Sequence, residues 1–160
     1  MQSKGAKATE DQVAAWRALY RADSLLFGHL NNLLRSRLGM TYFEREVLST
    51  LTDAGGRLRM ASLAAELMIS RSGATRLVNK METKDGWVVR ATSASDRRAI
   101  WAELTPSGRE ALAATQPVVD AVVSTFFADH LDAAELPRIT KALDRLATAN
   151  PGSADFDCGL

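Results

Sequence analysis

The residues best suited to chemistry in this sequence lie between Ser70 and Glu82, where polar and basic side chains recur on one face of a predicted helix. Apolar residues at three- and four-residue steps predict the buried face and leave the other positions exposed. Arginine pairs bidentately with guanine, asparagine pairs with adenine, and threonine offers a methyl group and a hydroxyl group. The exposed positions, together with the predicted N-cap Ser70, are Ser70, Arg71, Ser72, Thr75, Arg76, Asn79 and Lys80.

The pattern favours a helix that enters the major groove of double-stranded DNA. Residues near the N-terminus of such a helix usually reach the base edges. The predicted base-reading residues are therefore Arg71, Ser72, Thr75 and Arg76. Asn79 and Lys80 are predicted to contact phosphates, which position a protein without reading sequence. The alternative is a polar helix face that only keeps the protein soluble.

A second cationic feature, Asp96-Arg97-Arg98, lies in a polar loop between two apolar, β-prone segments at residues 87–91 and 99–104. These segments predict a β-hairpin with the two arginines at its tip. A guanidinium group in a narrow minor groove senses DNA shape, because such a groove concentrates negative potential. The alternative is a surface ion pair, which would contribute little to stability.

Positive charge is concentrated in the central third of the chain. Between Arg57 and Arg109 there are ten basic and five acidic residues, whereas the rest of the chain carries ten basic and fourteen acidic residues. This asymmetry is expected where one part of a protein faces phosphate. Four further basic residues are generic candidates for phosphate contacts, with a solvated surface as the equal alternative: Arg57, Arg59, Lys84 and Arg90.

The elements that must position these side chains follow from capping signals and periodicity. A first helix is predicted over residues 11–37, with an apolar stripe on a 3.6-residue period and an end at Gly39. A capping box from Thr41 to Glu44 opens a second helix. That helix is expected to bury Phe43, Val47, Leu48 and Leu51. The helix predicted at 70–82 is expected to bury Ala74, Leu77, Val78 and Met81. The other predicted elements are a short strand at 57–60, a helix at 61–68, strands at 87–91 and 99–104, and helices at 105–130 and 132–149.

This order of elements predicts a mainly α fold with a small β-wing. A winged helix-turn-helix over residues 41–104 is flanked by long N-terminal (11–40) and C-terminal (105–149) dimerisation helices, in one intertwined domain. Residues 1–10 and 150–160 are expected to form flexible tails.

The chain resembles the multiple antibiotic resistance regulator (MarR) family of winged-helix transcription factors. The most specific resemblance is Asp96-Arg97-Arg98, followed after five residues by Leu104-Thr105-Pro106-Ser107-Gly108. Leu63-Ala64, Ser70-Arg71-Ser72 and Gly86-Trp87-Val88-Val89-Arg90 support it. The resemblance implies a homodimer that represses promoters at pseudo-palindromic sites and is often released by a small aromatic or anionic effector. It also implies that Arg98 enters the minor groove and that Asp96 orients it.

An effector crevice is expected where the first, second and fifth helices meet the winged region. Trp16 and His29 are the candidate residues there, although Trp16 in a dimer core and His29 on a helix surface are the alternatives. The only cysteine, Cys158, lies in a polar C-terminal segment, so sensing through a low-pKa thiol is disfavoured.

Other classes of function find little support in the sequence. It contains no Gly-rich phosphate loop, no His/Cys metal cluster and no nucleophile with a plausible base, so we expect no catalytic residue, no metal site and no cofactor. No uninterrupted apolar run approaches the roughly 20 residues that span a bilayer, and the cytoplasm is the expected location. A transcriptional activator and a winged-helix protein–protein dimerisation module remain the alternatives to a repressor.

Overall fold

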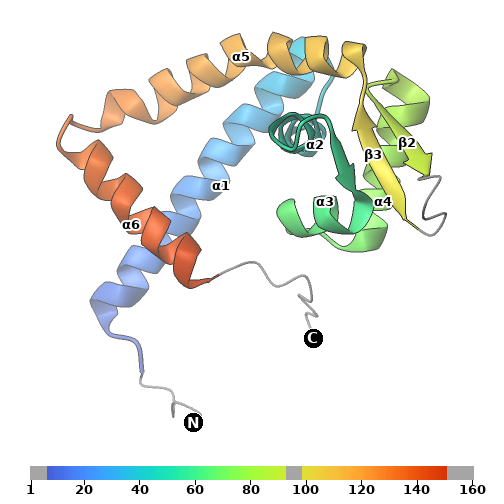
Figure 1. Ribbon diagram of the computed structural model, residues 1–160. Coiled ribbons are helices and arrows are strands. Elements are labelled where there is room, and N and C mark those ends of the chain that lie inside the picture. Colours follow the sequence, from blue (N-terminus) through green and yellow to red (C-terminus); the bar gives the residue numbers. More distant parts are fainter. Residues whose placement is uncertain (1–6, 93–98, 151–160) are drawn as a thin grey trace.

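The computed structural model of the protein describes residues 7–92 and 99–150, and most of its elements are helices (Figure 1). A small sheet and four short helical segments form a winged region, and three longer helices extend from it. The elements are α1 (Glu10–Leu38), α2 (Tyr42–Asp53), β1 (Arg57–Arg59), α3 (Met60–Glu66), α4 (Arg71–Lys80), η1 (Met81–Asp85), β2 (Val88–Thr92), β3 (Ile100–Leu104), α5 (Pro106–Phe126), η2 (Ala128–His130) and α6 (Glu135–Ala149). The predicted mainly α fold with a small β-wing is confirmed.

Local capping interactions explain where the helices begin and end. At the start of α2 the Thr41 hydroxyl accepts the Glu44 amide (3.3 Å) and the Glu44 carboxylate accepts the Thr41 amide (2.7 Å), which is the predicted capping box. The Ser70 hydroxyl caps α4 by accepting the Gly73 amide at 3.1 Å. Gly39 ends α1 with a φ of 65°, a left-handed conformation that glycine adopts without a steric penalty.

The three strands form an antiparallel sheet in the order β1-β3-β2. Helix α3, a tight turn and helix α4 follow β1 directly, and α4 continues into the π-helical turn η1. Gly86 ends that turn with a φ of 64° and directs the chain into β2. The helix predicted over 70–82 therefore ends three residues later, at Asp85, and changes its winding after Lys80.

One core joins α2, α3, α4 and the sheet. Its buried members are Met40, Val47, Leu48, Leu51, Leu63, Val78, Met81, Val88, Ala102 and Leu104. Phe43 was predicted to be buried, but 42% of it is exposed. It lies at the edge of the buried stripe of α2, which Glu44, Val47, Leu48 and Leu51 form, and it packs near Phe27 and Tyr42 instead. Leu77, also predicted to be buried, is only partly buried against the edge of the core.

Helix α5 runs without interruption through Pro117. By length and composition alone, the segment Pro106–His130 could cross a membrane, with a mean hydropathy of 1.4 over 18 residues. This result differs from the expectation from the sequence, which considered only uninterrupted apolar runs and found none long enough to span a bilayer. The helix nevertheless carries a polar side, where Gln116 donates a hydrogen bond to Asp120 at 2.8 Å. Its apolar side contacts α1 and α2.

Candidate nucleic-acid interface

The exposed side of α4 carries the four predicted base-reading side chains. Arg71, Ser72, Thr75 and Arg76 are all exposed, as the helical periodicity predicts. The Thr75 hydroxyl donates to the Arg71 carbonyl oxygen at 2.9 Å, which fixes its proton inside the helix. This leaves the Thr75 methyl group and hydroxyl lone pairs free for a partner. The geometry is compatible with base reading, which stays a prediction.

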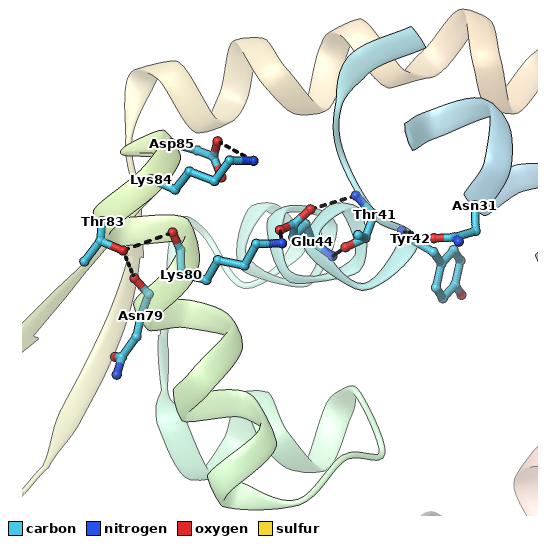
Figure 2. A network of polar contacts seen from close by, with 9 residues as sticks. All are labelled: Asn31, Thr41, Tyr42, Glu44, Asn79, Lys80, Thr83, Lys84 and Asp85. Carbon is cyan, nitrogen blue, oxygen red and sulfur yellow. Dashed lines mark hydrogen bonds and ion pairs between the residues drawn. The ribbon is translucent and has the colours of Figure 1, made fainter. Parts of the chain in front are cut away.

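The two predicted phosphate contacts, Asn79 and Lys80, have different surroundings. The Asn79 amide oxygen is buried and finds no hydrogen-bond partner in the described part of the chain. The Lys80 ammonium lies 2.6 Å from a carboxylate oxygen of Glu44, whose side chain is only 1% exposed (Figure 2). Lys80 thus reaches back from α4 to α2, and its charge is already paired.

The electrostatics of Glu44 reflect this pairing. Burial raises the pKa of the Glu44 carboxyl group, but hydrogen bonds from Lys80 and Thr41, together with the Lys80 charge, outweigh burial. The net pKa of Glu44 is therefore lowered, and the residue is ionised at neutral pH. The capping box was visible in the sequence, whereas nothing in the sequence indicated a partner on α4.

The wing residues Asp96, Arg97 and Arg98 fall outside the described residues, so their roles stay predictions. The strands on either side of them, β2 and β3, are paired from Val88↔Leu104 to Thr92↔Ile100 (Figure 1). Strand β2 is also tied to η1, because the Arg90 amide and side chain both donate to the Glu82 carboxylate at 2.9 and 2.7 Å. These hydrogen bonds lower the pKa of Glu82. The hairpin is thus attached to the C-terminal end of the α4–η1 segment.

Two arginines flank Trp101 at the base of the wing. The guanidinium carbons of Arg57 and Arg59 lie 4.4 and 5.2 Å from the Trp101 ring centroid, within cation–π range. Arg57 also pairs with Glu103, its neighbour across the sheet, at 3.0 Å. Sequence reasoning missed Trp101 and Glu103, because only the strand register brings them beside these arginines.

The four generic phosphate candidates therefore differ in the charges around them. Arg57, Lys84 and Arg90 each lie beside a carboxylate of Glu103, Asp85 or Glu82. No such carboxylate lies beside Arg59 among residues 7–92 and 99–150. Arg59 instead lines a hollow of about 400 Å³ with Met60, Ala61, Arg71, Thr75, Ala99 and Ile100. Within the described residues, Arg59 is thus a cation without a carboxylate partner between the start of α4 and the base of the wing.

The Thr105–Gly108 segment joins the wing to α5. The Thr105 hydroxyl donates toward the carbonyl oxygens of Gly86 (2.8 Å) and Trp87 (3.0 Å) and accepts the Gly108 amide at 3.0 Å. The Ser107 hydroxyl donates to the Gly86 carbonyl oxygen at 3.0 Å. This segment therefore holds the entry of β2 and the start of α5 together, in addition to the predicted N-cap at Thr105 with proline at the first helical position.

An apolar cavity of about 220 Å³ lies between α1, α2 and α5, close to the expected effector crevice. Its lining residues are Leu26, Phe27, Leu30, Tyr42, Val122, Val123 and Phe127. Neither predicted effector residue is among them: Trp16 is 67% exposed, and His29 stacks on Phe126 with ring centroids 4.1 Å apart. Both lie on the same helix as Leu26 and Leu30, but Trp16 is ten residues before Leu26 along α1 and His29 lies on another side of the helix.

The described residues contain no group of three or more His, Cys, Asp or Glu side chains that could hold a metal ion.

A helix-turn-helix, a three-stranded wing and a polar, cationic α4 together define a winged helix-turn-helix protein. Comparison with known proteins agrees. A model of the MarR family matches residues 38–99.

Two solved structures are similar over almost the whole chain. Sco3205, a MarR family transcriptional regulator from Streptomyces coelicolor solved in complex with DNA, is 31% identical with a TM-score of 0.82, and the match covers 92% of each chain. AbsC, a MarR family transcriptional regulator from the same organism, is 31% identical with a TM-score of 0.81 over 93% of this chain and all of its own. A proposed transcriptional regulatory protein for the hcr operon of Thauera aromatica is 39% identical over 62 residues, which span 39% of this chain and 37% of that relative.

The chain therefore belongs to the MarR family of DNA-binding transcriptional regulators, which is not a family of enzymes.

Proposed function

We propose that this protein is a cytoplasmic homodimeric repressor that binds a pseudo-palindromic operator and is released by a small aromatic ligand. The observation that carries the DNA-binding part is the exposed face of α4, where two arginines, a serine and a threonine share one side of the helix. The recognition helix of each protomer would read one half-site, and the two half-sites would lie about one helical turn apart. Arg98 and its orienting neighbour Asp96 would add a contact in the minor groove.

Unpartnered apolar surface supports the homodimer. Helix α6 buries none of its residues within the protomer, although apolar side chains recur along it. The large hydrophobic residues exposed on α1, α5 and α6 include Val13, Trp16, Leu19, Tyr20, Val123, Phe126, Leu143 and Leu146. Soluble monomers rarely leave so many large apolar side chains exposed on three helices. A second copy covering these three helices would also explain the apolar composition of α5.

The cavity between α1, α2 and α5 supports the ligand-responsive part and narrows the class of ligand. A cavity of about 150 Å³ with an apolar lining accepts benzene, so 220 Å³ accommodates a single substituted ring. The lining contains no basic residue. Burial and the nearby Glu46 charge raise the pKa of Tyr42, so its phenol stays neutral and able to donate a hydrogen bond. These properties favour an uncharged aromatic ligand over an anionic one.

Footprinting on the DNA upstream of the protein's own gene, with and without a panel of phenols, tests the proposal. We expect a protected pseudo-palindrome, loss of protection with an active phenol, and twice the protomer mass in multi-angle light scattering. Arg98→Ala should weaken operator binding strongly at fixed salt while the dimer stays folded, because salt alone changes affinity steeply. A stable monomer, or a random-DNA selection that enriches no motif, would contradict the proposal and favour a protein–protein module.

A further inference from the structure

The buried carboxylate of Glu44 has two polar partners on different elements. One oxygen accepts the Thr41 amide at 2.7 Å and completes the α2 cap. The other lies 2.6 Å from the Lys80 ammonium at the C-terminal end of α4 (Figure 2). An exposed glutamate would cap α2 equally well, so the cap does not require a side chain that is only 1% exposed. An ionised carboxylate at this depth does require a compensating charge.

The partner of Glu44 comes from the helix that is expected to read DNA. Lys80 is the last residue of α4, where the α-helix passes into the π-helical turn η1. Its side chain is half exposed, yet its ammonium is directed toward α2. Because a buried charge tolerates few alternative partners, rotation or sliding of α4 would leave Glu44 uncompensated.

We propose that Glu44 is a positioning residue that fixes the orientation of α4 through Lys80. Lys80 then contributes to DNA binding through this ion pair and not through a phosphate contact. The inference rests on the proposed function, in which α4 presents Arg71 to Arg76 to base edges. Bidentate base contacts require close geometry, so a small displacement of α4 reduces affinity without removing any DNA-contacting group.

Glu44→Gln separates the two possible roles of Lys80, because they predict changes in opposite directions. Glutamine keeps the volume and, at the third position of a capping box, the cap. If Lys80 bound a phosphate, removing the Glu44 charge would free its ammonium and raise operator affinity. If Glu44 positions α4, affinity falls, and we expect a decrease of about two- to thirtyfold.

The control is Glu46→Gln. Glu46 is on the same helix, its substitution removes the same charge, and it pairs with its neighbour Arg45 at 2.6 Å and not with α4. We expect its operator affinity to stay within about twofold of the wild type, because this partly buried pair joins neighbours on α2 and does not reach α4. An equal loss in both variants would show a general effect of charge and would overturn the inference.

Salt dependence distinguishes a phosphate contact made by Lys80 from its ion pair with Glu44. Loss of a phosphate contact lowers the slope of log affinity against log salt by about 0.9. Lys80→Gln should therefore weaken binding with an unchanged slope, and Lys80→Arg should restore affinity. The double variant Glu44→Gln/Lys80→Gln should bind the operator no more weakly than Glu44→Gln alone, since the two substitutions break the same ion pair. A slope reduced by about 0.9 in Lys80→Gln would overturn the inference.

Backbone amide hydrogen exchange tests the positioning without DNA and so independently of the proposed function. Glu44→Gln should speed exchange over Arg71–Lys80 relative to both the wild type and Glu46→Gln. Unchanged exchange there would contradict the inference even if the protein bound its operator. Failure of the wild-type protein to select any DNA sequence, with faster exchange in Glu44→Gln, would contradict the proposed function alone.

Discussion

The backbone carbonyl of Trp87 occupies the space that a side chain on Gly108 would need. A Cβ atom at Gly108 would overlap the Trp87 carbonyl oxygen and would lie 2.8 Å from a methyl carbon of Leu104. Trp87 leads into β2, Leu104 ends β3, and Gly108 lies in the first turn of α5. The absence of a side chain therefore lets α5 pack directly on the wing, and this explains why glycine occupies the last position of the motif that begins at Leu104.

Gly108→Ala should destabilise the protein by about 1–3 kcal/mol, because one methyl group must displace backbone at a packed junction. Gly28→Ala is the matched control, since a Cβ atom there meets nothing within 4 Å in the protomer. In a helix interior the control change should be neutral or stabilising by roughly 0.5–1 kcal/mol. Urea unfolding at one protein concentration measures both. Equal stability of the two variants would show that the junction relaxes around the methyl group.

The lowered pKa of Glu44 predicts a pH-dependent contribution to stability. Because its pKa in the folded state lies below the unfolded value, the contribution is complete above the unfolded pKa and is lost as pH falls through the folded one. At pH 7, Glu44→Gln should lower the free energy of unfolding by about 1.5–3 kcal/mol, the range for a hydrogen bond to a charged group.

Urea unfolding of the wild type and Glu44→Gln at pH 7, 5, 4 and 3 measures this contribution. The difference between the two proteins should stay constant down to about pH 4.5, the ordinary glutamate value, and shrink below it. A difference that grew as the pH fell would contradict the lowered pKa. Protein concentration must be held constant, because dimerisation would add to the measured stability.

Arg59 is predicted to contact a DNA phosphate at the base of the wing. Its guanidinium lies over Trp101 and lines the same hollow as Arg71. Arg59→Ala should weaken operator binding and lower the salt slope by about 0.9.

Arg57→Ala is the matched control, because Arg57 lies over the same ring but is neutralised by Glu103. Its salt slope should stay at the wild-type value. Titrations at three salt concentrations compare the two variants, and identical slopes for them would refute the assignment of Arg59.

Filling the cavity should abolish the response to ligand while DNA binding persists. Leu30→Trp adds bulk at a partly buried position of the lining, at a cost of about 1–3 kcal/mol in stability. We expect phenol to release wild-type protein from its operator more effectively than 4-hydroxybenzoate, and neither to release Leu30→Trp. Fluorescence anisotropy of labelled operator measures release.

His29→Gln provides the control for this experiment, since His29 follows Gly28 on the same helix but stacks on Phe126 outside the cavity. Its response should match the wild type. Loss of the ligand response in His29→Gln together with a normal response in Leu30→Trp would contradict the assignment of the cavity and would place the ligand at His29, as first inferred from the sequence.

Features that depend on nearby residues could be predicted from the sequence. The caps at Thr41, Ser70 and Thr105 involve hydrogen bonds between residues three positions apart, so short motifs are sufficient to predict them. Helical periodicity placed Arg71 and Arg76 on the exposed face of α4 for the same reason, because the direction of a side chain depends on its position within a turn. Family membership also followed from a motif of continuous sequence.

Features that depend on packing between distant segments were decided only by the tertiary structure. Periodicity placed Lys80 on the surface of α4 but could not reveal a carboxylate 36 positions earlier in the chain. Phe43 lies outside the core and packs near Phe27 of α1, a contact that no local pattern encodes. The cavity likewise exists only because three helices meet there. Short-range hydrogen bonds and periodicity therefore determined the elements and the exposed polar side of α4, whereas charge pairing and cavity lining depended on how those elements pack.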